Sequence, residues 1–221
     1  MQKFTTPAAI TTVLDIPAGR IQLIAADRTD TTVEVRPADS AKSRDVKAAE
    51  QITVTHTDGV VRIAAPEAKK QLFGPSGSVE VTVQLPAGSH VRATAACGEL
   101  RGVGRLGDVT VDSAQGPVKL DEAAGARLTL QDGDITIGRL GGDAEISTQR
   151  GDLTVTEALH GTVTLRTQSG DISVGAARGV SATLDAGTGY GRVDNSLKND
   201  GAIELALHAT TAHGDITARS L

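Results

Sequence analysis

Aromatic residues are almost missing from this chain of 221 residues, which contains two Phe, one Tyr and no Trp. A compact globular core normally uses many aromatic side chains, so the composition argues against an ordinary globular fold. It also argues against a nucleic-acid partner, because stacking aromatics are scarce and the 22 basic residues are interspersed with 27 acidic ones. A narrow interior filled by medium-sized aliphatic side chains fits the composition better.

Cysteine and long apolar runs are equally scarce. Cys97 is the only cysteine, which excludes an internal disulfide. No run of eighteen apolar residues is present, and residues 1–7 are not followed by the apolar core of a secretory signal. We therefore expect no membrane insertion and a cytoplasmic location.

Glycine, in contrast, is abundant and periodic. A Gly-Asp pair followed by strict apolar/polar alternation recurs about every eighteen residues, and further glycines continue the same phase with other second residues. A fixed period made of a turn and a strand predicts a β-solenoid, in which each coil stacks on the one before it. This first glycine series comprises Gly98, Gly116, Gly133, Gly151, Gly170, Gly191 and Gly214.

A second glycine series lies half a coil away and should mark the other corner of each coil. The strands that it opens are expected at residues 109–111, 128–130, 144–146, 163–165 and 203–205. Each coil then holds at least two strands, with a third short strand as an open alternative, and the general preference of parallel crossovers predicts right-handed winding. The second series comprises Gly107, Gly125, Gly142, Gly161, Gly179 and Gly201.

The first ninety residues are β-rich but less regular. Asp58-Gly59 between two alternating runs predicts a hairpin, residues 37–50 predict a loop or one short helix, and residues 66–77 form a polar stretch with Lys69 and Lys70. Strands are expected at residues 32–36, 51–56, 60–64 and 79–85.

We therefore interpret residues 1–221 as one all-β domain, a single-stranded right-handed β-helix with about eighteen residues per coil. Residues 1–90 would form irregular coils and a cap, and residues 91–221 the regular Gly-Asp coils. The similarity of Pro17-Ala18-Gly19 to Pro86-Ala87-Gly88 suggests that one corner is used twice. The chain ends on a repeat strand without a visible cap. Either residues 1–90 fold back over that edge or it associates with another copy.

Four aspartates, Asp134, Asp152, Asp171 and Asp215, follow corner glycines and should form a ladder along the rod. Such a ladder could bind cations or raise one pKa through like-charge repulsion. The favoured interpretation is that each Asp bonds the backbone of its own turn, because calcium-binding repeats place several glycines around each Asp. The sequence thus assigns no metal, cofactor or catalytic residue.

Other candidates also have structural explanations. Cys97 has no His at a telling spacing and is expected to be a buried or half-buried thiol, the Arg150-Gly151-Asp152 tripeptide is an accidental match to an adhesion motif, and Tyr190 lies where the repeat deviates. An outward hydroxyl column reflects the preference of Thr for strands; it comprises Thr136, Thr154, Ser173 and Thr217. The five histidines share no repeat phase, which argues against an enzyme; they are His56, His90, His160, His208 and His213.

The Gly-Asp-Ile/Leu-Thr/Ser-Val repeats, together with the entry strand Val79–Gly88, resemble the bacterial DUF4097 family of adhesin-like β-helix proteins. The whole chain is similar to a short actinobacterial form without a membrane anchor. The resemblance implies a single-stranded right-handed β-helix, and it carries over no catalytic residues.

The sequence therefore predicts a non-enzymatic scaffold or binding module that presents flat β faces to a protein or polymer partner. Two alternatives remain open: a cell-surface adhesin or polysaccharide-binding protein, and a carbohydrate-active β-helix enzyme. Self-association through the C-terminal edge is a further expectation.

Overall fold

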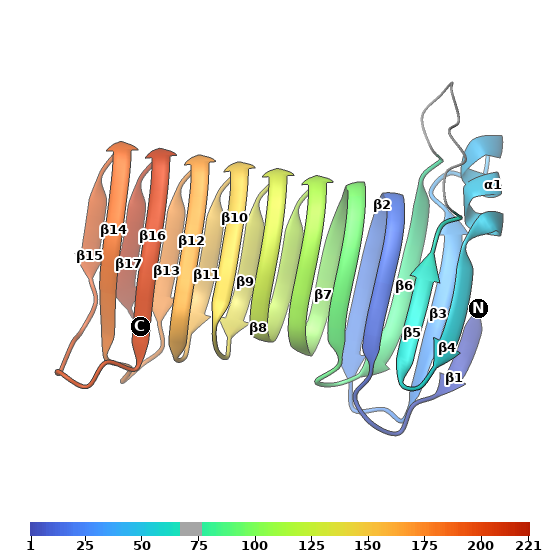
Figure 1. Ribbon diagram of the computed structural model, residues 1–221, viewed down its shortest axis with the longest axis horizontal. Coiled ribbons are helices and arrows are strands. Elements are labelled where there is room, and N and C mark those ends of the chain that lie inside the picture. Colours follow the sequence, from blue (N-terminus) through green and yellow to red (C-terminus); the bar gives the residue numbers. More distant parts are fainter. Residues whose placement is uncertain (67–76) are drawn as a thin grey trace.

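The computed structural model describes residues 1–66 and 77–221 as a nearly all-β rod (Figure 1). Two rows of strands pack face to face, and each regular coil contributes one strand to each row. The predicted β-solenoid is confirmed. Each regular coil within the described residues has two strands and lacks the third short strand that the sequence left open. Lys69 and Lys70 lie outside the described residues.

We call the strands that precede the first-series glycines row A and those that follow them row B. In spatial order, row A contains β4 (Thr53–Thr57), β5 (Val60–Ala64), residues 11–18 of β2 (Thr11–Ala26), residues 90–97 and 108–115 of β7 (His90–Gln115), residues 125–132 of β8 (Val118–Asp132), β10 (Ala144–Arg150), β12 (Gly161–Ser169), β16 (Leu205–His213) and β14 (Ala182–Tyr190).

Row B contains β1 (Gln2–Thr5), β3 (Asp30–Pro37), β6 (Val79–Pro86), residues 19–26 of β2, 98–103 of β7 and 118–123 of β8, β9 (Ile135–Leu140), β11 (Leu153–Ala158), β13 (Ile172–Ala176), β17 (Ile216–Ser220) and β15 (Val193–Ser196).

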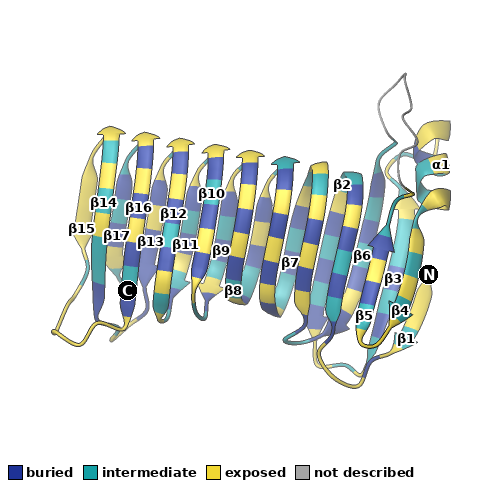
Figure 2. Ribbon diagram, in the orientation of Figure 1, coloured by how far each residue is buried: buried dark blue, intermediate teal, exposed yellow. Residues whose placement is uncertain are grey.

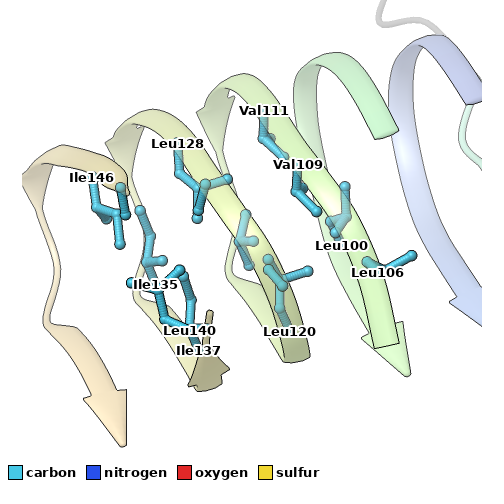
Figure 3. Close-up of a cluster of buried hydrophobic side chains, with 14 of the residues drawn as sticks. Leu100, Leu106, Val109, Val111, Leu120, Leu128, Ile135, Ile137, Leu140 and Ile146 are labelled. Carbon is cyan, nitrogen blue, oxygen red and sulfur yellow. The ribbon is translucent and has the colours of Figure 1, made fainter. Parts of the chain in front are cut away.

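The alternation seen in the sequence becomes alternation of burial along each strand (Figure 2). Successive side chains of a strand point to opposite faces, so the aliphatic residues of both rows meet between the rows. Leu128 of row A and Ile137 of row B are both fully buried in this way. Figure 3 shows the resulting core, in which side chains of one coil pack on those of the next.

The first glycine series forms one straight column. Gly151 has φ +138°, and a Cβ atom there would overlap the carbonyl oxygen of Gly133 in the neighbouring coil. The same overlap would occur along the column from Gly98 to Gly214. Gly19 pairs with Gly98 and is a further member that the periodicity did not reveal. Only glycine lets consecutive corners approach this closely.

The second glycine series is less regular than predicted. Gly125 pairs with Asp108, one position out of phase with Gly107. Gly179 and Gly201 lie before the strands instead of opening them: Ala182 and Gly161 both pair with Leu205, and Ile203 is outside β16. The predicted strand at 203–205 was therefore wrong. Corners on this side vary in length, from two residues between β11 and β12 to five between β13 and β14, so their glycines have no fixed place.

The reuse of one Pro-Ala-Gly corner was also a wrong prediction. Gly19 lies in the first glycine column, whereas Gly88 approaches Gly107 on the opposite side of the rod. Pro86 pairs with Ala26, seven residues beyond Gly19 in β2.

Antiparallel strands close one end of the rod. β3 pairs antiparallel with β6 and β1 with β3, while β4 and β5 form the predicted hairpin. The rings of Phe4 on β1 and His56 on β4 lie 5.2 Å apart and join the outermost strands of the two rows. Residues 37–50 contain the helix α1 (Ser43–Gln51), which packs beside β3 and β6.

An ion-pair cluster ties β1 to β3. Asp30 accepts a hydrogen bond from Arg28 at 2.9 Å and lies 3.0 Å from the Lys3 amino group. The hydrogen bonds from Arg28 and then Lys3 lower the pKa of Asp30 to about 2. This outermost strand is therefore held by charge as well as by its backbone ladder.

At the other end the chain does not stack in sequence order. β16 pairs with β12 on one side and with β14 on the other, and β17 pairs with β13 and β15. The C-terminal coil thus lies inside the rod, and the coil β14–β15 is outermost (Figure 1). Both sequence-based alternatives were wrong for the C-terminal strand, which neither offers a free edge nor is covered by residues 1–90.

The chain returns into the rod through residues 197–204. Asn195 and Asn199 each accept a hydrogen bond from the backbone two residues ahead, and the backbone of Lys198 donates to Ser220 at 2.9 Å. The backbone N–H of Ala202 and the Ser181 hydroxyl lower the pKa of Asp200. These local bonds shape a loop long enough to pass the edge of one coil.

Candidate functional site

The four corner aspartates lie in one column, as the repeat predicts, but they bond between coils and not within their own turns. Oδ1 of Asp134 accepts a hydrogen bond from the backbone N–H of Asp152 at 2.9 Å, and Oδ1 of Asp152 accepts one from Asp171 at 2.8 Å. Asp171 accepts from the N–H of Asp215 at 2.7 Å. Each carboxylate therefore links one coil to the next.

Basic residues lie at both ends of this column. The N–H of Arg192 donates to Oδ1 of Asp215 at 2.8 Å, and its guanidinium lies 3.6 Å from the same carboxylate. Towards the capped end, Arg20 lies 3.0 Å from Glu99 and 3.7 Å from Glu80. Arg192 was not a candidate site residue from the sequence because it breaks the Gly-Asp pattern after Gly191, as Glu99 and Pro117 do after their glycines.

Each carboxylate of the ladder therefore has a structural role. One oxygen of each Asp is taken by a backbone donor, and the residues described contain no group of three or more His, Cys, Asp or Glu side chains arranged to hold a metal ion. The arrangement resembles helix capping, in which a short acidic side chain satisfies a backbone N–H that has no other partner.

Replacing Asp152 by alanine should lower the free energy of unfolding by about 0.5–2 kcal/mol, by analogy with the loss of a helix cap. The N–H of Asp171 would lose its acceptor, whereas the Asp152→Asn variant retains an oxygen in the same place. Urea unfolding of the three proteins measures the difference. Equal stability of Asp152→Ala and the wild type would contradict a linking role.

The remaining candidate site residues from the sequence lie on separate parts of the rod. Cys97 is exposed, contrary to expectation; it stands at the last strand position before the Gly98 corner, where the inward-facing alternation ends. Arg150 is paired with Asp132 at 2.9 Å, so the tripeptide that it begins is part of a strand ladder. Tyr190 stacks on His213 with ring centroids 5.0 Å apart.

The other histidines lie on separate elements. His90 is 3.5 Å from Asp108 and His208 is 3.4 Å from Asp185, while His56 contacts Phe4. His160 lies at the corner near Gly142. The structure does not bring these side chains together, in agreement with their unrelated phases in the sequence.

The outer faces of the two rows are polar and regular. On row B, the hydroxyl column is aligned as predicted: Thr154 pairs with Thr136 and Ser173, and Ser173 pairs with Thr217. On row A, three exposed glutamines follow one another in adjacent strands; they are Gln131, Gln149 and Gln168. Neighbouring side chains in such columns are one strand spacing apart, about 4.8 Å.

A shallow depression of about 400 Å³ interrupts the outer face of row A. It exists because Gly125 has no side chain between Asp108 of β7 and Asp143, which immediately precedes β10. Arg127 and Glu145, 3.5 Å apart, line it together with hydroxyl groups. The phase shift of Gly125 is the signal that would have located it in the sequence. The other lining residues include Thr110 and Thr162.

Comparison with known proteins finds distant structural neighbours and one family. Among solved structures, a putative adhesin of Bacteroides fragilis has 14% identity and a TM-score of 0.47, with 98% of this chain and 95% of that chain covered. A putative cell adhesion protein of Clostridium sporogenes has 12% identity and a TM-score of 0.39, with 100% and 98% covered. A putative lipid binding protein of Parabacteroides distasonis has 9% identity and a TM-score of 0.36, with 98% and 95% covered.

Among curated proteins, none matches the chain significantly in sequence. Within the described residues, no helix has the length and apolar character needed to cross a membrane. The model of the family described as Toastrack DUF4097 matches residues 13–220, which is nearly the whole chain. The chain therefore belongs to the Toastrack DUF4097 family, as its Gly-Asp coils suggested.

Proposed function

We propose that this protein is a non-enzymatic scaffold or binding module that presents the outer face of row A to a polar polymer or protein partner. The observation that carries the proposal is the depression at Gly125, which opens on a flat face lined with hydrogen-bonding side chains. Asp108, Asp143 and Glu145 supply acceptors there, and Arg127 supplies donors.

The spacing of these groups suits an extended partner. Side chains in one column repeat at about 4.8 Å along the rod, so a partner lying along the rod meets similar groups at successive coils. The aromatic platforms of a stacking site are missing from the depression, whose lining contains acidic, basic, hydroxyl and small aliphatic residues. Binding would therefore depend on hydrogen bonds and charge pairs to a hydroxyl- or amide-rich surface.

Filling the depression should abolish this binding. A Cβ atom at Gly125 would meet only the end of the exposed Asp108 side chain at 2.8 Å and the Asp143 carbonyl oxygen at 3.3 Å, so the Gly125→Gln variant should fold. We expect it to lose at least about tenfold in affinity, equivalent to roughly 1.4 kcal/mol, for any ligand bound by the wild type. The measurement is titration against a panel of soluble bacterial polysaccharides and proteins captured from the native organism.

The matched control is Thr156→Gln, which adds the same side chain to the exposed face of row B. Equal binding by Gly125→Gln, Thr156→Gln and the wild type would reject the depression as the site. Two further assays separate the alternatives. Recovery of the native protein in the envelope fraction would favour a surface adhesin over a cytoplasmic module, and release of reducing ends from any polysaccharide would favour an enzyme.

A further inference from the structure

The two ends of the rod are finished differently. At one end the outermost strands, β1 and β4, run antiparallel to their neighbours, and the Phe4–His56 contact joins the two rows. At the other end β14 and β15 run parallel to their neighbours; like β1 and β4, they pair only on their inner sides within the part of the chain that is described. Free edges in monomeric proteins usually carry Lys, Pro or a bulge that prevents pairing. Neither β14 nor β15 contains Lys or Pro.

The apolar interior also reaches the surface at this end. Val193 is 45% exposed although it pairs with the buried Ile216, and Leu184 and Ala186 are only partly buried. Tyr190 at the end of β14 and Ile203 in the return loop are 75% and 59% exposed. Figure 2 shows β15 as exposed along its whole length.

We propose that a second copy of this chain covers the end formed by β14 and β15, so that two rods join tail to tail. The free edge has two rows of backbone groups about 10 Å apart, and a single extended peptide could pair with only one of them. A second copy presents both rows at the same spacing. In a two-fold arrangement β14 pairs antiparallel with β14 of the second copy, and β15 pairs antiparallel with β15 of the second copy.

Charge and size agree with this occupant. The end carries three basic and, with Glu204 of the return loop, four acidic side chains, so two copies meet with only one net negative charge each although the whole chain has a net charge of −5. The nine residues of β14 span about 30 Å. With two rows, each copy would bury on the order of 500 Å², which is close to the lower limit for a specific interface. The seven charged residues are Arg178, Asp185, Arg192, Asp194, Lys198, Asp200 and Glu204.

Two consequences follow from the arrangement. The complex closes as a dimer and does not grow into a filament, because a two-fold interface uses the same end of both copies. Row A of one copy also continues into row A of the other, and row B into row B. The row A faces of both copies therefore point to the same side. An extended partner would then meet two equivalent faces at once, which strengthens binding through effective concentration.

Sedimentation of the full-length chain between about 1 μM and 1 mM tests the proposal, since an interface of this size predicts a dissociation constant of order 1–100 μM. The Val193→Lys variant should weaken dimerisation at least tenfold: its ammonium group reaches water in the monomer but is buried in the dimer. Small-angle scattering of the wild-type dimer should give about twice the length of the monomer.

The matched control is Thr156→Lys, which adds the same charge at an exposed position in the middle of row B. If Val193→Lys does not fold, Asn195→Lys on the same exposed strand replaces it. A monomer at every concentration would overturn the proposal. So would a dimer that both lysine variants weaken equally, a dimer no longer than one rod, or open-ended filaments.

Discussion

The Gly151→Ala variant should lose more than about 3 kcal/mol of folding stability, although it adds a single methyl group. Two costs add: a side chain at φ +138° is strained by about 1–3 kcal/mol, and the new Cβ would overlap the carbonyl oxygen of Gly133. The backbone ladders on both sides of the corner prevent the coils from moving apart. Urea unfolding followed by circular dichroism measures the loss.

The matched control is Gly187→Ala. Gly187 lies on β14, where an added Cβ meets no atom within 4 Å and the backbone is compatible with a side chain, so we expect a change within about 0.5 kcal/mol. Gly19→Ala should resemble Gly151→Ala, since Gly19 occupies the same column. Similar stability of Gly151→Ala and Gly187→Ala would contradict a steric requirement for glycine at the corner.

This steric requirement also explains why the sequence predicts the fold well. At the first corner, every coil needs a residue without a side chain, so the requirement appears as a regular glycine period. At the second corner the number of residues between the strands varies, and Gly125, Gly179 and Gly201 occupy different places in it. A glycine period is therefore informative only where neighbouring backbones approach one another closely.

The order of stacking could not be predicted in the same way. Parallel ladders use backbone groups that every residue carries, so β14–β15 and β16–β17 are equally able to follow β12–β13. The only trace in the sequence is the lengthening of the glycine intervals to 21 and 23 residues around Gly191. The extra residues form the loop 197–204 that carries the chain back past one coil.

The sequence predicted the candidate sites only in part, because a period predicts alignment but not contacts. The alignment of Asp134, Asp152 and Asp171 follows from the period, but the partner of each carboxylate depends on the offset between adjacent corners. The depression on row A was missed because it results from a single phase shift at Gly125. Departures from a repeat are where surface features arise, since the repeat itself generates a uniform face.

Replacing Leu207 by alanine should remove about 2–5 kcal/mol, as for other fully buried leucines, and should loosen two coils together. Leu207 lies on β16 between Val163 of β12 and Leu184 of β14. Within the described residues, β14 and β15 are attached to the rod only through β16 and β17. Hydrogen exchange should therefore show loss of protection over residues 182–220 at once, with β8 and β9 unchanged.

Because the C-terminal coil is inserted into the rod, we expect an unusual order of amide protection against hydrogen exchange even in the wild type. Chain ends normally exchange fastest, yet β17 is paired on both sides and β15 on one, so amides of β17 should exchange more slowly than those of β15. Leu128→Ala in the middle of the rod is the control, because it should affect β7, β8 and β10 and leave residues 182–196 protected. Faster exchange in β17 than in β15 would contradict the insertion, because a strand held between two ladders opens only when one of its neighbours has already left.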